Sequence, residues 1–304
     1  MSKFKTMLKL VKTPKKMIIP LADNGVLNWI PDEAYLRLAF YCQMGKPLDL
    51  NKPKTFSEKL QWLKLHDRKE LYHTLVDKYE VKEYVASIIG PEYIVPTLGV
   101  WNDPDEIKIE ELPDQFVLKC THDSGSVVIC RDKSTFDKKE AMQRLKKHAN
   151  KSIFWFGREW PYKGIKPRII AEEYLGGGDK GLNDYKVLCF HGIPKLIEVH
   201  EGRMTANHTQ DFYTTKWERT EIAQENEPRS DNPINPPDQL ELILDLSSRL
   251  AKDFIHIRID WYIANNKLYF GEITFYDGSG FCAFTNERFD VEIGNWIHLP
   301  IDLK

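Results

Sequence analysis

The most regular alternation of hydrophobic and polar residues in the chain lies at residues 255–280. Three isoleucines alternate with polar residues, among them Arg258 and Asp260, and a period of two predicts a half-buried strand. The segment ANNK that follows is typical of a turn, because Asn tolerates positive φ. Residues 268–275 then read as a second strand, so the pattern predicts a β-hairpin.

A three-residue loop over residues 265–267 would set the register of this hairpin. It would place Asp260 opposite Glu272 and Arg258 opposite Thr274, on one face, with Cβ atoms about 5 Å apart. Two opposed carboxylates repel unless a cation lies between them, and Mg²⁺ takes one or two carboxylates together with water and phosphate oxygens. The alternative is a solvated charged face. From the hairpin alone this alternative is favoured, because most charged strand positions face water.

The rest of the chain predicts a mixture of helices and strands. The signals are helical periodicity with start and stop residues, and short β-branched or aromatic runs bounded by turn residues. They indicate helices beginning at Pro31, beginning at a cap on Thr55 or Ser57, and spanning residues 71–89, 136–149 and 238–253, strands at residues 116–120, 127–130, 169–175, 184–190 and 195–200, and a loop over residues 201–217.

Composition favours an ordinary globular protein of one large or two modest domains. The 304 residues are 42% hydrophobic and 29% charged, with a formal net charge of −2. That balance argues against bulk nucleic-acid binding, which needs a basic surface. Five cysteines without CxxC spacing suggest reduced core residues of a cytoplasmic protein, and no apolar run is long enough to span a membrane.

The N-terminus is basic, with six Lys in the first sixteen residues. Phe4, Met7, Leu8 and Val11 fall at helical spacing between them. An amphipathic helix on an anionic membrane and a solvated arm that packs lightly on the body explain this pattern equally well.

Two further segments carry groups that suit anions. Lys119 ends the strand at residues 116–120, and the Ser/Gly loop that follows would leave backbone N–H groups open to an anion. The segment 153–168 is rich in aromatic residues and cations. Its cations would bind an anionic substrate or stack on tryptophans. The three histidines 122, 200 and 208 lack metal-ligand spacing and suit structural or substrate hydrogen bonds.

Taken in order, these motifs resemble the ATP-grasp superfamily, and more closely the TupA-like ATP-grasp proteins of bacterial surface-polysaccharide gene clusters. The resemblance runs from about residue 30 to the C-terminus. It is carried by the stretches KTFSEKLQWLKLHDR, LVDKYEVKEYV, FVLKCTHDSG, GREWPYK and YFGEITFYDGSGF. It implies an α+β ATP-grasp fold in which two subdomains clamp ATP, preceded by a mainly helical domain.

The resemblance also implies domain limits. Residues 1–30 would be a basic arm and residues 31–92 the helical domain. Residues 93–176 would form the subdomain with the phosphate loop, and residues 177–304 the subdomain with the Mg²⁺-binding hairpin.

Roles for individual residues follow from the same resemblance. Those expected to touch ATP or Mg²⁺ match motif positions of the family, whereas the substrate contacts are placed on the cationic segment and on one histidine. The expected sets are Lys78, Lys119, Ser124, Gly125, Ser126, Glu172, Glu173, Tyr174, Leu175, Asp184 and Lys186 for ATP, Asp260, Glu272 and Thr274 for Mg²⁺, Arg258 and Arg203 for catalysis, and Arg158, Lys163, Arg168 and His208 for substrate. Thr274 departs from the commoner Asn of the superfamily, and a neutral hydroxyl is a poorer metal ligand.

The implied activity is amide formation between a carboxylate and an amine through an acyl phosphate, driven by ATP. The resemblance implies a sugar carboxylate, such as a uronic acid, as acceptor and an amino acid or other amine as partner. A metal-dependent glycosyltransferase of polysaccharide synthesis is the alternative. The chain has no DxD motif, and two lysines with an adenine-type linker suit ATP better.

Overall fold

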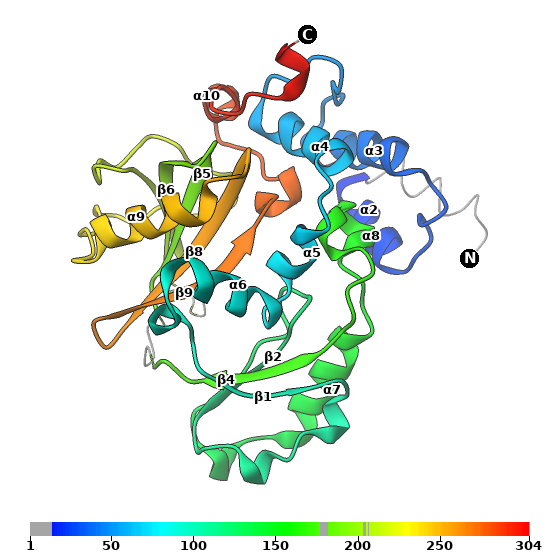
Figure 1. Cartoon of the computed structure of the whole chain (residues 1–304). Helices are drawn as coiled ribbons and strands as arrows, with labels where there is room; N and C mark the ends of the chain where they lie inside the picture. The colour runs from blue at the N-terminus through cyan, green and yellow to red at the C-terminus, as the bar shows by residue number, and fades with distance from the viewer. Residues whose placement is uncertain (1–13, 177–181, 203–204, 206, 304) are drawn as a thin grey trace.

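The computed structural model describes residues 14–176, 182–202, 205 and 207–303. In these residues helices and antiparallel strands combine into an α+β fold (Figure 1). The helices are α2 (Pro14–Asp23), α3 (Asp32–Met44), α4 (Phe56–His66), α5 (Leu71–Val76), α6 (Glu80–Ile89), α7 (Lys138–Ala149), α8 (Phe154–Gly157), α9 (Leu240–Ala251) and α10 (Glu287–Gly294). The strands are β1 (Thr97–Trp101), β2 (Phe116–Cys120), β3 (Val128–Cys130), β4 (Ile169–Glu173), β5 (Asp184–Phe190), β6 (Ile193–Glu201), β7 (Thr209–Thr214), β8 (His256–Ala264) and β9 (Lys267–Thr274).

The larger sheet has five antiparallel strands in the order β7-β6-β5-β8-β9. Its strands alternate apolar and polar residues, so one face is hydrophobic and packs against α9 (Figure 1). Trp261 lies fully buried on that face and donates its indole N–H to Ser247 Oγ of α9 at 2.9 Å. The opposite face carries the polar residues of β5, β6, β8 and β9.

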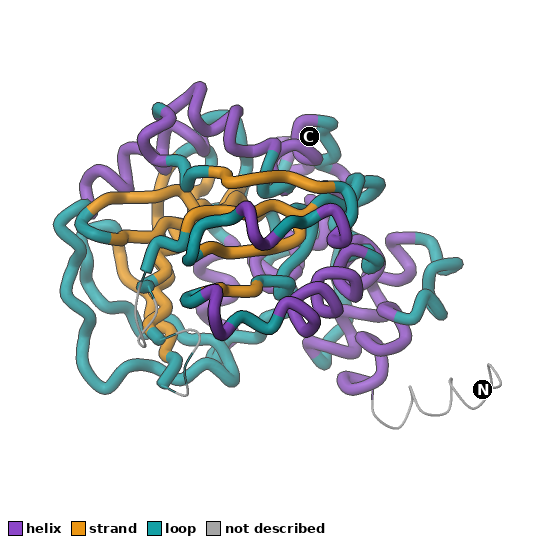
Figure 2. Tube along the Cα trace, turned by 90° about the horizontal axis from the view of Figure 1, so that it is seen from below, coloured by secondary structure: helices purple, strands orange, loops and turns teal. Residues whose placement is uncertain are grey.

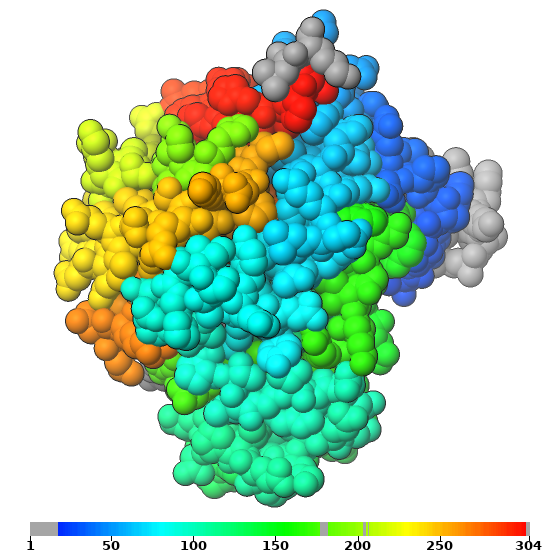
Figure 3. Space-filling model, viewed as in Figure 1, coloured from blue at the N-terminus to red at the C-terminus, as the bar shows by residue number. Residues whose placement is uncertain are grey.

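The smaller sheet has four antiparallel strands in the order β1-β4-β2-β3. Its own hydrophobic cluster includes Phe116, Leu118 and Leu145, the last from α7. In the space-filling view this sheet and α7 form a separate lobe at the bottom of the molecule (Figure 3). The second core explains why the lobe is distinct.

Helices α2, α3 and α4 lie close together on the side of the molecule where Figure 1 marks the N-terminus, and Figure 2 shows helices gathered near that terminus. Helix α4 is capped by Thr55, which forms a capping box with Glu58. Thr55 is one of the two caps that the sequence predicts. The polar residues of this helix are buried as well. Lys59, for example, donates to the carbonyl oxygens of Gly294 and Ile297 at 3.0 and 2.8 Å, which ties α4 to the end of α10.

Residues 18–27 are packed more tightly than a lightly attached arm. Ile18, Leu21, Ala22 and Leu27 are buried in the main hydrophobic core. The amphipathic spacing predicted over residues 4–11 lies outside the described residues. No described helix has the length and apolar character needed to cross a membrane.

The hairpin of β8 and β9 has the predicted pairs of charged residues, but its loop and its register near the loop differ from the prediction. Its loop has two residues, Asn265 and Asn266, with φ of 50° and 59°, and Ala264 pairs with Lys267. The predicted three-residue loop is therefore wrong, because two adjacent asparagines with positive φ close the tighter turn typical of a hairpin. A β-bulge beside Asp260 then shifts the register by one residue and places Asp260 opposite Glu272.

Two other predicted elements are also corrected. The helix predicted over residues 71–89 is broken at Asp77, whose carboxylate accepts hydrogen bonds from the N–H groups of Tyr79 and Glu80 and so caps α6. Asp77 is buried, so this break lies inside the protein. Strand β7 lies within the segment predicted as a loop. By contrast, the strands predicted at residues 184–190 and 195–200 are confirmed, and they pair as the hairpin of β5 and β6.

The bulge yields a testable prediction. A Cβ atom on Gly271 would lie 2.7 Å from the Tyr262 ring and 3.0 Å from the Asp260 carbonyl oxygen. We expect Gly271→Ala to force the strands apart and to lower the free energy of unfolding by about 1–3 kcal/mol. Asn266→Gly is the control, because Asn-Gly is favoured in this turn and should change stability by less than about 0.5 kcal/mol. Urea unfolding measures both, and equal effects would contradict the bulge.

Candidate functional site

Charged side chains form a row across the polar face of the five-stranded sheet. Glu198 pairs with Lys186, Lys186 with Asp260, and Asp260 with Glu272, each on the neighbouring strand. Directly opposed residues share a face, so the row runs from β6 to β9. Alternation along the strands adds Asp184 on β5 and Arg258 on β8 to the same face.

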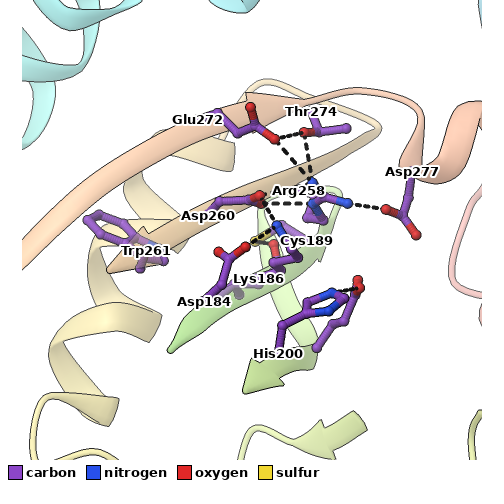
Figure 4. A network of polar contacts seen from close by, with 12 residues as sticks. Asp184, Lys186, Cys189, His200, Arg258, Asp260, Trp261, Glu272, Thr274 and Asp277 are labelled. Carbon is purple, nitrogen blue, oxygen red and sulfur yellow. Dashed lines mark hydrogen bonds and ion pairs between the residues drawn. The ribbon is translucent and has the colours of Figure 1, made fainter. Parts of the chain in front are cut away.

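Two cations hold the carboxylates of this face together (Figure 4). Arg258 binds Asp260 with two parallel hydrogen bonds, Nε to Oδ1 at 2.8 Å and Nη2 to Oδ2 at 2.9 Å. Arg258 forms two further ion pairs, one with Asp277 in the turn after β9 and one with Glu272 Oε1 at 3.4 Å. Lys186 pairs with Asp260 and, at 2.9 Å, with Asp184. The cluster is thus one connected ion network.

The ion network is buried, and burial together with the neighbouring charges shifts the pKa values of its members. Burial raises the pKa of Asp260 to about 6, although Arg258 and Lys186 oppose this shift. Burial and Arg258 lower the pKa of Lys186, but Asp260 and Asp184 outweigh them and the net direction is upward. Both groups are therefore charged at neutral pH.

The ion network carries an excess of negative charge, which a bound cation would offset. Four carboxylates contact two cations, so the six groups carry a formal excess of two negative charges, of which Lys78 at 3.9 Å from Glu272 Oε2 offsets one. Among the described residues no set of three or more His, Cys, Asp or Glu side chains is placed to hold a metal. Two opposed carboxylates completed by phosphate oxygens suit Mg²⁺. Thr274 Oγ1 accepts from Arg258 Nη2 at 3.2 Å.

Lys78 connects the two lobes at this point. The break between α5 and α6 turns it toward the loop after β2, where its backbone N–H donates to Thr121 O at 2.9 Å. Its ammonium group donates to Asp123 O at 2.5 Å and lies 3.9 Å from Glu272 Oε2. The structure therefore brings Lys78, the Ser/Gly loop and the β9 carboxylate together, as the predicted phosphate site requires.

Within the Ser/Gly loop the three predicted residues differ. Ser124 and Gly125 are exposed at the tip. Ser126 is buried: its hydroxyl donates to Asp123 Oδ1 at 2.5 Å and accepts from Cys120 N at 2.8 Å. Ser126 therefore shapes the loop, whereas the exposed tip remains open to a ligand.

Lys119 points into a second ion cluster, in the smaller sheet. Glu172 of β4 lies between Lys119 Nζ at 2.5 Å and Lys82 Nζ at 2.6 Å. Burial opposes ionisation of Glu172, but the two lysines outweigh it and hold the pKa of this carboxyl below its usual 4.5. The side chain of Glu172 thus anchors the lysines, while Glu173, the next residue, is exposed.

The remaining predicted residues are spread over three places. Tyr174 and Leu175 are half-buried after β4. His208 contacts His200, with 2.8 Å between His208 Nε2 and His200 Nδ1. Arg203 lies outside the described residues.

The cations of residues 153–168 lie away from the ion network. Arg158 is buried and donates to Leu27 O at 3.0 Å, so it stabilises the N-terminal region, and this burial argues against substrate binding. Arg168 is paired with Asp77 and Glu80. Lys163 is exposed and lies over the rings of Phe154 and Trp160.

Sequence reasoning missed four residues of these clusters. Lys82 follows Lys78 by one helical turn on the same face, a spacing that could have suggested it. Glu198 alternates with His200 along β6, a period-two signal. Asp77 and Asp277 have no such signal, since only the tertiary fold brings them to Arg168 and Arg258.

The chain matches one protein family and is similar to several solved structures. The family described as TupA-like ATPgrasp matches residues 58–298. No curated protein matches the chain. Among solved structures it is similar to D-alanine–D-alanine ligase from Helicobacter pylori (15% identity, TM-score 0.42, 81% of this chain and 70% of that one) and to an L-amino acid ligase from Bacillus licheniformis (12%, 0.43, 83% and 55%).

A third similar structure is D-alanine–D-alanine ligase from Bacillus anthracis complexed with ATP, at 15% identity and a TM-score of 0.38. That similarity covers 66% of this chain, which spans about half the length of that ligase, 53%.

The family match over residues 58–298 places the chain in the class of ATP-grasp proteins. Within that class the chain belongs to the TupA-like ATP-grasp family, which confirms the resemblance drawn from the sequence.

The Glu172 cluster predicts a pH-dependent stability. We expect Glu172→Gln to leave two part-buried lysines without their carboxylate and to destabilise the protein by about 3 kcal/mol at neutral pH. Because the folded pKa of Glu172 lies below 4.5, the wild type loses this stabilisation as pH falls below about 4.5. The difference between the two proteins should therefore shrink at acid pH.

Urea unfolding across that pH range measures the effect, with exposed Glu173→Gln as the matched control. The control should change stability by less than about 0.5 kcal/mol. A difference between wild type and Glu172→Gln that grows toward acid pH would contradict the charge pairing.

Proposed function

We propose that this protein is an ATP-dependent carboxylate–amine ligase that forms an amide through an acyl phosphate. The observation that carries the proposal is the position of Lys78 between the Ser/Gly loop and Glu272. A triphosphate lying along this ammonium group would reach the carboxylates of the hairpin. The family match supports the same reaction class.

Each residue of the proposed site would have its own role in phosphoryl transfer. Asp260 and Glu272 would hold Mg²⁺, which supplies charge neutralisation on the phosphates when bound. Lys78 and Lys119 would add positive charge near the phosphates, and Arg258 would orient Asp260 and Glu272. Such transfer needs positioning and electrostatic stabilisation more than covalent chemistry from the protein.

For the substrates we propose a uronic-acid carboxylate of a surface polysaccharide and an amino acid or other amine. The polymer would be a capsule, an O-antigen or a teichuronopeptide-like chain. Support comes from the TupA-like family match. Of the cations in residues 153–168, Lys163 and Lys166 are exposed and would be open to the acceptor.

The ligase proposal predicts ADP release that depends on Mg²⁺, a carboxylate and an amine. We expect Asp260→Asn and Glu272→Gln to lower this rate at least about 100-fold, because the phosphate charge is no longer neutralised. The measurement is ADP release across a panel of uronic acids and amino acids. Asp245→Asn, exposed on α9, is the control with wild-type rate.

A thermal-shift comparison distinguishes the ligase from a glycosyltransferase. Mg·ATP should raise the melting temperature, and Mg·UDP-sugars should not. Stabilisation by the UDP-sugar alone would overturn the ligase, as would unchanged ADP release in both carboxylate variants.

We further propose that the protein works in the cytoplasm at the inner face of an anionic membrane. The five cysteines are all free. Trp29 is 76% exposed on the turn after α2, and Ile19 and Val26 nearby in sequence are exposed as well. Arg158 holds this turn by donating to Leu27 O and Ile30 O. A fixed, exposed Trp beside a lysine-rich terminus suits a lipid interface.

Vesicle flotation tests the membrane proposal. We expect binding to vesicles that contain phosphatidylglycerol but not to pure phosphatidylcholine, and a loss of about tenfold in Trp29→Ala. Ile193→Ala removes a hydrophobic residue of 54% exposure on the β5–β6 turn and is the control. Equal binding by all three proteins would contradict an interface at Trp29.

A further inference from the structure

A chain of hydrogen bonds leads from a buried carboxylate toward the surface beside the ion network. Glu198 of β6 is only 3% exposed, and its Oε1 accepts from Gln210 Nε2 at 2.8 Å. The same oxygen lies 2.5 Å from His200 Nε2 (Figure 4 draws His200 at this contact). His200 Nδ1 in turn lies 2.8 Å from His208 Nε2, with the two rings almost parallel at 11°.

The carboxylate fixes where the protons of this chain lie. Burial raises the pKa of Glu198, but His200 and Arg258 outweigh it and the net direction is downward, so Glu198 is ionised and can only accept. With its proton on Nε2, where it donates to Glu198 Oε1, His200 offers Nδ1 as an acceptor. His208 therefore donates from Nε2, and its Nδ1 carries the lone pair of a base.

The chain lies where it could serve the reaction. In the register of β5 and β6, Glu198 is opposite Lys186 and His200 is opposite Asp184. The exposed fraction of the side chain rises from 3% at Glu198 through 9% at His200 to 25% at His208, so the outer imidazole is the one that a substrate can reach.

The charges that act on the chain come from every neighbouring element. They are Asp184 and Lys186 of β5, Arg258 of β8, Asp277 of the turn after β9, and Glu227, whose Oε2 lies 3.6 Å from His208 Nδ1. Glu227 is placed to stabilise a positive charge that forms on His208.

We propose that His208, oriented by His200 and Glu198, is the general base that takes a proton from the ammonium form of the amine substrate. This inference rests on the proposed ligase function and adds to it the group that activates the nucleophile. His200 and Glu198 are positioning residues, because they act through His208.

The step balances as follows. One N–H bond of the ammonium group breaks and its proton bonds to His208 Nδ1. The freed nitrogen lone pair forms the C–N bond at the acyl carbon, while the C–O bond to phosphate breaks and phosphate leaves with that electron pair. The second nitrogen proton goes to phosphate, and the His208 imidazolium later releases its proton to solvent.

Hydroxylamine provides a sharp test, because near neutral pH it is an uncharged nucleophile that needs no base. The probes are D-glucuronic and D-galacturonic acid, each with either L-alanine or hydroxylamine, and the products are the amide and the hydroxamate. In His208→Asn we expect the ratio of hydroxamate to amide to rise about 100-fold, since general base catalysis contributes about 10²–10⁴. An unchanged ratio overturns the inference.

Glu198→Leu is the variant for the positioning role. It removes the oxygen that accepts from His200 Nε2, so the proton of His200 and the orientation of His208 are no longer fixed. We expect the same rise in the ratio and the loss of the plateau in the pH profile of amide formation. A wild-type pH profile in this variant contradicts the relay.

His298→Asn, on an exposed residue remote from the network, should leave the ratio and the pH profile unchanged. Melting temperatures separate these effects from misfolding, because misfolding lowers both products together and leaves the ratio unchanged. If the wild type forms neither product with any probe, the ligase proposal fails, and the base fails with it. That result is distinct from a working ligase whose ratio does not change.

Discussion

The compensation of buried negative charge on the polar face of the five-stranded sheet is the constraint on which the site depends. Asp260 is fully buried, and an isolated carboxylate there would be strongly unfavourable. Arg258 and Lys186 make it tolerable, and Arg258 in addition binds carboxylates on β9 and on the turn beyond it. One guanidinium group therefore fixes the relative positions of the groups that the proposed metal site needs.

The same principle joins the two lobes. Each sheet has its own hydrophobic core, so apolar packing within a lobe does not determine how the lobes face each other. Ion pairs do cross between segments: Lys78 reaches Glu272, and Lys82 reaches Glu172. Lys78 lies just before α6, and Lys82 lies on its first turn.

The hairpin shows how far local sequence reasoning extends. The opposed carboxylates were predictable, because alternation along each strand assigns Asp260 and Glu272 to one face. The length of the loop was not predictable. The turn is one residue shorter than predicted, and a bulge at Gly271, where a side chain would meet Tyr262, adds one residue and so restores the predicted register. A bulge depends on close packing between strands, which the hydrophobic pattern does not encode.

The amino-acid sequence by itself determined most of the strands and the carboxylate pair, because periodicity and turn residues are local properties. The α+β class and the expected roles of Lys78 and Lys119 came from the resemblance to the ATP-grasp superfamily. Only the tertiary structure decided which charges meet. It buried Arg158 beneath the N-terminal turn, brought Asp277 to Arg258, and linked Glu198 to His208 through His200. These contacts join residues on different elements, and their partners are selected by the cost of leaving a charge unpaired in a buried place.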